Sequence, residues 1–176
     1  MDYELKAGVL CRQGGGPPLA RIRMGLPGSA RQILGPDGTL LLRTEIRRLD
    51  GPPGQGGDVR YTKYVMCRDD GREYASGAPR YAEGDDPERV GWPICRMPRT
   101  DHALIAMGAV QYILRMESSR EYCMEDSAGR RMLHIVHGGA MGGWRLEAEQ
   151  TFPACFLCGL FIFCRYLESE NQFLTV

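Results

Sequence analysis

The feature that most constrains the fold is a C-terminal segment without polar side chains. From Ala154 to Cys164 every residue is apolar, cysteine or glycine, and Arg165 follows. The run is too short for a bilayer, which takes about 20 apolar residues. A helix with no polar face must be surrounded by other parts of the protein. We therefore expect a buried α-helix over roughly residues 153–167 and no transmembrane span.

The remainder of the chain has the pattern of short strands joined by hairpins. Apolar runs lead into an Asp and a Gly at Asp37–Gly38, Asp69–Gly71 and Asp126–Gly129, and another run follows each of them. Asp can accept hydrogen bonds from the turn backbone, and Gly tolerates a positive φ. About ten to twelve strands of this kind before Gln150 predict a sandwich or a barrel.

A buried helix decides between these two architectures. One flat sheet cannot cover a helix on all sides, so the strands should wrap around it. We expect a mostly β protein, a closed antiparallel β-barrel around a central hydrophobic C-terminal α-helix, since closure also removes exposed strand edges. At 176 residues one domain is expected over 1–176, with strands roughly over residues 3–150. The small residues Ala154 and Gly159 would let the helix approach the barrel wall where the barrel is narrow.

Composition limits the partners and the compartment. Lys+Arg and Asp+Glu are both 22, so no overall field attracts nucleic acid or an anionic membrane, and any such attraction must come from a local patch. Seven scattered cysteines suit reduced thiols in a cytoplasm. The first ten residues, MDYELKAGVL, do not have the pattern of a signal peptide. We expect a cytoplasmic protein without a nucleic-acid partner.

The Asp–Gly hairpins, the stretch GGWRLEAEQTF and the apolar helix after it together resemble the tubby C-terminal-domain group. That group includes the LURP-one-related proteins and the phospholipid scramblases. The resemblance implies a barrel of about 12 strands around the helix, and the brevity of the chain suits a bacterial tubby-like protein. It also implies a non-enzymatic binding module, peripheral to the membrane, for anionic lipid headgroups such as phosphoinositides. It assigns that role to no particular arginine.

Two groups of residues are candidates for binding an anionic ligand. The first is the loop RMPRTDH, in which Pro98 stiffens a segment that carries Arg96, Arg99 and His102. Arginine pairs can hold phosphate. The alternative is a solvated connection with local ion pairs, as exposed charge clusters usually are. The second basic patch consists of Arg43, Arg47 and Arg48.

The cysteine and histidine motifs do not indicate catalysis. Cys155-x-x-Cys158 lies near the expected helix start, where a redox thiol would be placed, but its apolar neighbours favour buried, inert thiols. A zinc site usually needs four ligands, and the sequence has no second CxxC and no HxxxH pair to complete the set. His134 and His137, three apart on a strand, face opposite sides. We therefore expect no metal, no cofactor and no enzymatic activity.

Two other functions stay open at this point. One is a structural or protein-interaction barrel without a small ligand. The other is a thiol redox protein that uses Cys155 and Cys158.

Overall fold

The computed structural model describes residues 1–23, 30–51, 58–87 and 98–171. These residues form twelve strands and the helix α2 (Ala154–Ser169), with short 3-10 turns η1 (Val59–Tyr61) and η2 (Gly139–Met141). The strands are β1 (Asp2–Lys6), β2 (Val9–Arg12), β3 (Ala20–Arg23), β4 (Arg31–Leu34), β5 (Leu40–Arg48), β6 (Thr62–Cys67), β7 (Glu73–Tyr81), β8 (Thr100–Met107), β9 (Val110–Ser118), β10 (Glu121–Asp126), β11 (Arg131–His137) and β12 (Trp144–Ala148).

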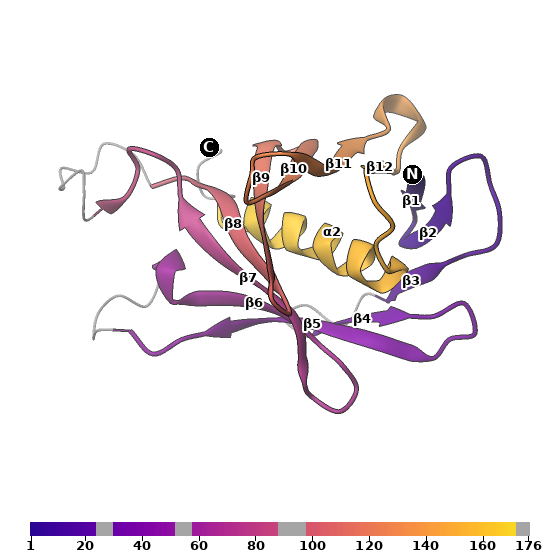
Figure 1. Ribbon diagram of the computed structural model, residues 1–176, viewed down its shortest axis with the longest axis horizontal. Coiled ribbons are helices and arrows are strands. Elements are labelled where there is room, and N and C mark those ends of the chain that lie inside the picture. The colour runs from indigo at the N-terminus through magenta and orange to yellow at the C-terminus, as the bar shows by residue number, and fades with distance from the viewer. Residues whose placement is uncertain (24–29, 52–57, 88–97, 172–176) are drawn as a thin grey trace.

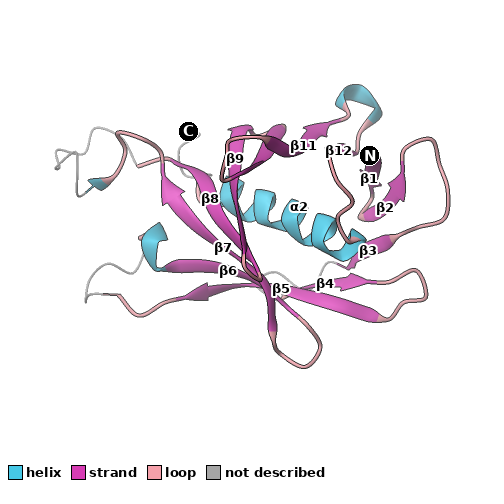
Figure 2. Ribbon diagram, in the orientation of Figure 1, coloured by secondary structure: helices cyan, strands magenta, loops and turns pink. Residues whose placement is uncertain are grey.

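The sheet is a closed antiparallel barrel in which each strand pairs with its neighbours in sequence. The barrel closes where β1 pairs with β12, with Asp2 opposite Glu147 and Leu5 opposite Trp144. Helix α2 runs through the middle of the strands (Figures 1 and 2). The predicted fold, a mostly β barrel around a C-terminal helix, is therefore confirmed. No helix among the described residues has the length and apolar character needed to span a membrane.

The three Asp–Gly turns form as the sequence predicts. Asp37 Oδ1 accepts hydrogen bonds from the backbone N–H of Thr39 at 3.1 Å and from its hydroxyl at 2.7 Å. Asp126 Oδ1 accepts from the N–H of Ala128 at 2.9 Å. Gly38, Gly71 and Gly129 have φ of 85°, 80° and 76°, in the region that favours glycine. These local bonds place β4 beside β5, β6 beside β7 and β10 beside β11.

The barrel interior is packed with side chains from α2 and the inner face of the strands. Phe156, Leu157, Leu160 and Phe163 have an exposed fraction of 0%. The predicted close approach at Gly159 is present, because a Cβ built there would lie 2.5 Å from Met66 Sδ on β6. The described side chains of α2 thus form one continuous core with those of the strands.

Hydroxyl groups attach the C-terminal half of α2 to the wall. The buried side chains of Thr44 and Tyr166 are hydrogen-bonded through their oxygens at 3.1 Å. Tyr64 Oη donates to Glu170 Oε1 at 3.4 Å. Among the described residues no buried side-chain polar atom lacks a hydrogen-bond partner. These contacts fix how far the helix enters the barrel.

Candidate functional site

The side chains of α2 and of the inner strand faces form the core, and the predicted site residues that the structure describes lie on the outer surface or at the barrel ends. Of the first predicted group, Arg96 lies outside the described residues. Arg99 is exposed, and its backbone N–H donates to Asp85 Oδ2 at 3.1 Å. The Arg99 side chain forms no ion pair with any other residue that the structure describes. This arginine is therefore free to meet a ligand.

His102 takes part in a different arrangement. Its Nδ1 lies 2.7 Å from Asp101 Oδ1. On the sheet it is the cross-strand partner of Arg80 on β7 and of Arg115 on β9. Arg115 Nε donates to Glu125 Oε2 at 3.3 Å. The structure thus places His102 in a row of partly compensated charges, and it shows no contact between His102 and Arg99.

The second predicted group divides between two environments. Arg43 and Arg47 share the outer face of β5, where Arg43 Nη2 contacts Asp69 Oδ1 at 3.2 Å and Arg47 Nε contacts Glu45 Oε1 at 2.5 Å. The hydrogen bond to Glu45 raises the pKa of Arg47. Both positive charges are therefore balanced by carboxylates of the same surface.

Arg48 follows Arg47 directly, so strand alternation turns it to the other side of β5. There its positive charge acts on Glu170 at the end of α2. Burial raises the pKa of Glu170, and the hydrogen bond from Tyr64 and the charge of Arg48 oppose that rise. Arg48 thus belongs to the end of the barrel, apart from Arg43 and Arg47.

Two arginines on β3 were not among the predicted site residues. Arg21 and Arg23 are exposed and flank Ile22, so both point outward. Within the described part of the chain neither forms an ion pair. The signal was present in the sequence as arginines two apart in ARIR, but only the strand order shows what lies beside them.

Strand register places these arginines next to β4 and β5. Arg23 is opposite Gln32, which is in turn opposite Arg43. Arg21 is opposite Leu34. With strands about 4.8 Å apart, the Cα atoms of Arg23 and Arg43 are about 10 Å apart. We call this outer surface the arginine face, and it consists of Arg21, Arg23, Gln32, Leu34, Leu41 and Arg43.

The arginine face also carries apolar side chains. Leu41, two residues before Arg43 and on the same side of β5, is 37% exposed. Leu34 is partly exposed. Leu34 is also the cross-strand partner of Arg21, which forms no ion pair among the described residues, so this surface can contact both a headgroup and the apolar region next to it.

The CxxC thiols lie in an apolar environment. Cys158 has an exposed fraction of 0%, and burial raises its pKa to about 12. Cys155 is half-buried, and burial also raises its pKa. A raised pKa keeps a thiol protonated at neutral pH, whereas redox catalysis uses the thiolate. No group of three or more metal-ligating side chains occurs within the described ranges.

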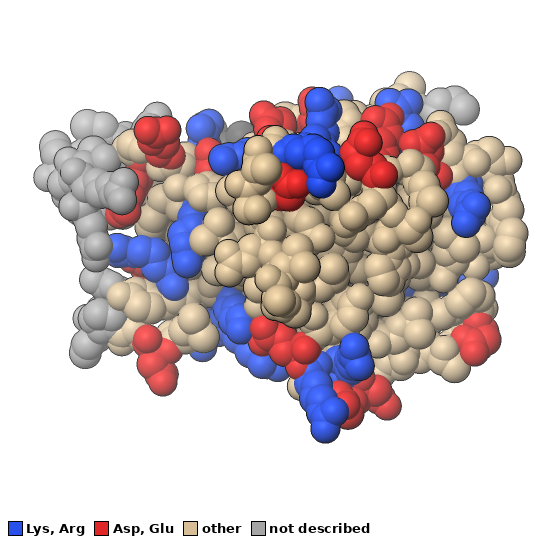
Figure 3. All heavy atoms as spheres, viewed as in Figure 1, with Lys and Arg blue, Asp and Glu red and all other residues tan. Residues whose placement is uncertain are grey.

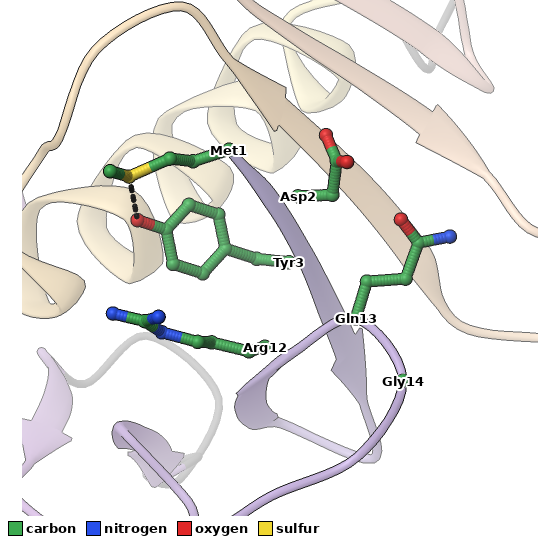
Figure 4. Close-up of a pocket in the computed structure, with 6 residues that line it drawn as sticks. All are labelled: Met1, Asp2, Tyr3, Arg12, Gln13 and Gly14. Atoms are coloured by element: carbon green, nitrogen blue, oxygen red, sulfur yellow. Dashed lines mark hydrogen bonds between the residues drawn. The ribbon is translucent and has the colours of Figure 1, made fainter.

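One surface cavity, of 430 Å³, lies where β1 and β2 meet. Figure 4 shows its lining residues Met1, Asp2, Tyr3, Arg12, Gln13 and Gly14. Asp2 and Gln13 point to one side of the strands, and Tyr3 and Arg12 to the other. Tyr3 Oη donates to Met1 Sδ at 3.7 Å.

A second cavity, of 380 Å³, is bordered by the β11–β12 hairpin. It is lined by Glu4, Gln13, Val136, His137, Gly138, Gly139, Gly142, Trp144 and Arg145. His137 and the glycines belong to the run HGGAMGGW of the sequence.

No family model matches the chain, and no curated protein matches it. The chain is similar to a protein from Arabidopsis thaliana solved by X-ray crystallography, with 9% sequence identity and a TM-score of 0.39, over 95% of this chain and 90% of that one. This likeness says nothing about ligand or activity.

Proposed function

We propose that the protein is a non-enzymatic binding module that docks on anionic lipid headgroups, such as phosphoinositides, through the arginine face. The observation that carries this proposal is that Arg21 and Arg23 are exposed, share one outer surface with Arg43, and form no ion pair within the described residues. The filled barrel interior supports a ligand on the outside.

The chemistry of the face suits a lipid. Arginine forms charge-assisted, often bidentate hydrogen bonds with phosphate. The exposed side chain of Leu41 can contact the apolar part of the lipid. The formal net charge of the chain is zero, so attraction to a membrane must be local. A cytoplasmic protein at the periphery of an anionic membrane surface is the arrangement that this face fits.

Co-sedimentation with liposomes tests the proposal. Wild-type protein should bind vesicles of phosphatidylcholine that contain phosphoinositide more strongly than vesicles of pure phosphatidylcholine, and binding should fall as salt screens the charges. The double variant Arg21→Gln/Arg23→Gln should bind about 30-fold more weakly, at about 1 kcal/mol for each basic residue near the surface.

A matched control changes the same charge elsewhere. Arg120→Gln/Arg131→Gln removes two exposed arginines outside the arginine face and should bind as the wild type does. A third variant, Arg99→Gln, tests the sequence-predicted loop. Absence of binding to any anionic vesicle at low ionic strength, or equal loss in the control variant, would reject the arginine face as a lipid site.

A second candidate function is protein interaction through the outer surface of β7, β8 and β9. Register aligns Ala78, Leu104 and Ile113 in one outward row, and Leu104 is 42% exposed. In Figure 3 a broad central part of the molecular face shown carries no charged side chain. A partner that co-purifies with the wild type should be lost with Leu104→Glu and retained by Arg21→Gln/Arg23→Gln.

A further inference from the structure

The outer surface that carries the arginine face continues from β3 onto β2 and β1. Val9 on β2 is the cross-strand partner of Arg21, and Lys6 on β1 is the partner of Val9. Leu5 and Leu10 are buried inside the barrel, so strand alternation turns the residues beside them outward. One row of outward side chains therefore crosses four adjacent strands: Lys6, Val9, Arg21 and Leu34.

Lys6 adds another cation without an ion pair to this surface. Its side chain is exposed, and it pairs with no carboxylate in the described parts of the chain. Glu4, two residues before it on the same side of β1, is the cross-strand partner of Arg145. The other lysine of the chain differs, because Lys63 Nζ contacts the two carboxylate oxygens of Glu73 at 3.0 and 2.9 Å.

The cations of this surface are spread over a wide part of the barrel wall. Arg21 and Arg23, two residues apart on β3, lie about 7 Å from each other, close enough to share one phosphate. Lys6 on β1 and Arg43 on β5 are separated by four strand spacings, about 19 Å around the wall. The wall of a closed barrel also curves, so outward directions diverge from strand to strand. A single headgroup cannot contact all of these side chains.

Apolar side chains separate the cations. Val9 lies between Lys6 and Arg21, and Leu34 lies on the other side of Arg21; both apolar side chains are partly exposed. A free phosphate compound in water makes no use of such neighbours. In a bilayer the apolar region lies directly beneath the headgroups, where valine and leucine can contact it.

We propose that the arginine face, together with Lys6 and Val9, binds the surface of an anionic bilayer through several separate headgroups and responds to the density of negative charge. This inference rests on the proposed function, and it names the bilayer, not a soluble phosphate compound, as the ligand. Each basic residue near an anionic surface raises the affinity about fivefold, whichever anionic lipid supplies the charge. Phosphatidylserine should therefore be bound as well as a phosphoinositide.

Vesicles of equal surface charge test the inference. One set contains phosphatidylserine in phosphatidylcholine, and the other contains a phosphatidylinositol bisphosphate in phosphatidylcholine, in proportions that give both sets the same electrophoretic mobility. Wild-type protein should bind both sets with equal affinity in co-sedimentation. Soluble inositol trisphosphate should displace it no more than sodium chloride of the same ionic strength does.

The outcomes separate this inference from the proposed function. Tighter binding to the phosphoinositide set, or specific displacement by inositol trisphosphate, overturns the inference and leaves the arginine face as a site for one headgroup. Absence of binding to both sets at low ionic strength rejects the proposed function, and the inference with it.

A pair of lysine variants tests the extent of the surface. Lys6→Gln should weaken binding to both vesicle sets about fivefold. Lys63→Gln removes the same charge from a lysine that is paired with Glu73, and it should bind as the wild type does. Unchanged circular dichroism spectra and thermal melts show that both variants are folded. Wild-type affinity in folded Lys6→Gln overturns the wide surface.

Discussion

The side-chain amide of Asn171 is hydrogen-bonded to both the backbone N–H and the backbone carbonyl of Thr100. Asn171 Nδ2 donates to Thr100 O at 2.6 Å, and the N–H of Thr100 donates to Asn171 Oδ1 at 3.0 Å. Thr100, at the start of β8, is 1% exposed. Asn171 therefore acts as a short strand partner, and it attaches the end of α2 to the barrel wall.

Replacement of Asn171 should destabilise the protein. Asn171→Ala leaves two buried backbone groups of Thr100 without partners, which costs about 1–3 kcal/mol for each unsatisfied group. Urea unfolding followed by circular dichroism measures the change. Ser169→Ala, which removes one hydroxyl from the same end of the helix, serves as the control and should cost less. If Asn171→Ala unfolds at the wild-type urea concentration, the amide does not hold α2 in place.

Gly159 should tolerate no larger side chain while Met66 is present. Gly159→Val places new atoms where Met66 Sδ lies, and overpacking of this kind costs about 1–3 kcal/mol. Met66→Ala alone opens a cavity, at about 2–5 kcal/mol. The double variant should lose less stability than the sum of the two single variants, because the valine fills part of that space. Additive free energies of unfolding would show that the two residues are not in contact.

Asp58 should make stability depend on pH. The hydrogen bond from the Arg60 side chain lowers the pKa of Asp58 below its usual value of 3.8, although partial burial opposes this. A carboxylate with a lowered pKa stabilises the fold above its unfolded pKa, and this contribution is lost as pH falls through the folded pKa. Asp58→Asn should therefore destabilise the protein at neutral pH, by about 1–3 kcal/mol.

Thermal melts of Asp58→Asn and wild type should converge as pH falls below 3.8. The control is Asp69→Asn, because Asp69 pairs with Arg43 at an exposed surface position. Such pairs contribute about 0–1 kcal/mol. A difference between Asp58→Asn and wild type that stays constant with pH would contradict an ionised Asp58 as its cause.

The thiols of α2 should differ in reactivity. Cys158 and Cys164 are fully buried, and burial raises the pKa of both. Alkylation with iodoacetamide, read by mass spectrometry, should leave these two unmodified in the native protein and modify them in denaturant. Cys155, which is half-buried, should react at an intermediate rate. Rapid native modification of Cys158 would revive the thiol redox alternative.

Much of the fold was predictable because its determinants are local. Asp37 accepts a hydrogen bond from the backbone N–H of Thr39, two residues later in the chain. Such a bond forms a turn without contacts from distant residues. The apolar run that begins at Ala154 needs burial wherever it lies. The site was less predictable. The sequence predicts a basic patch at Arg43 and Arg47, but their charges are balanced by Asp69 and Glu45.

The sequence by itself determined the strands, the turns and the need for a wall around one helix, because turn chemistry and apolar periodicity act over a few residues. Only the tertiary structure decided which charges are compensated. Arg23 and Arg43 are far apart along the chain, and they share one surface because Gln32 pairs with both. Glu4 and Arg145 meet because β1 closes the barrel against β12. Such relationships depend on strand register, which the packing of the whole barrel sets.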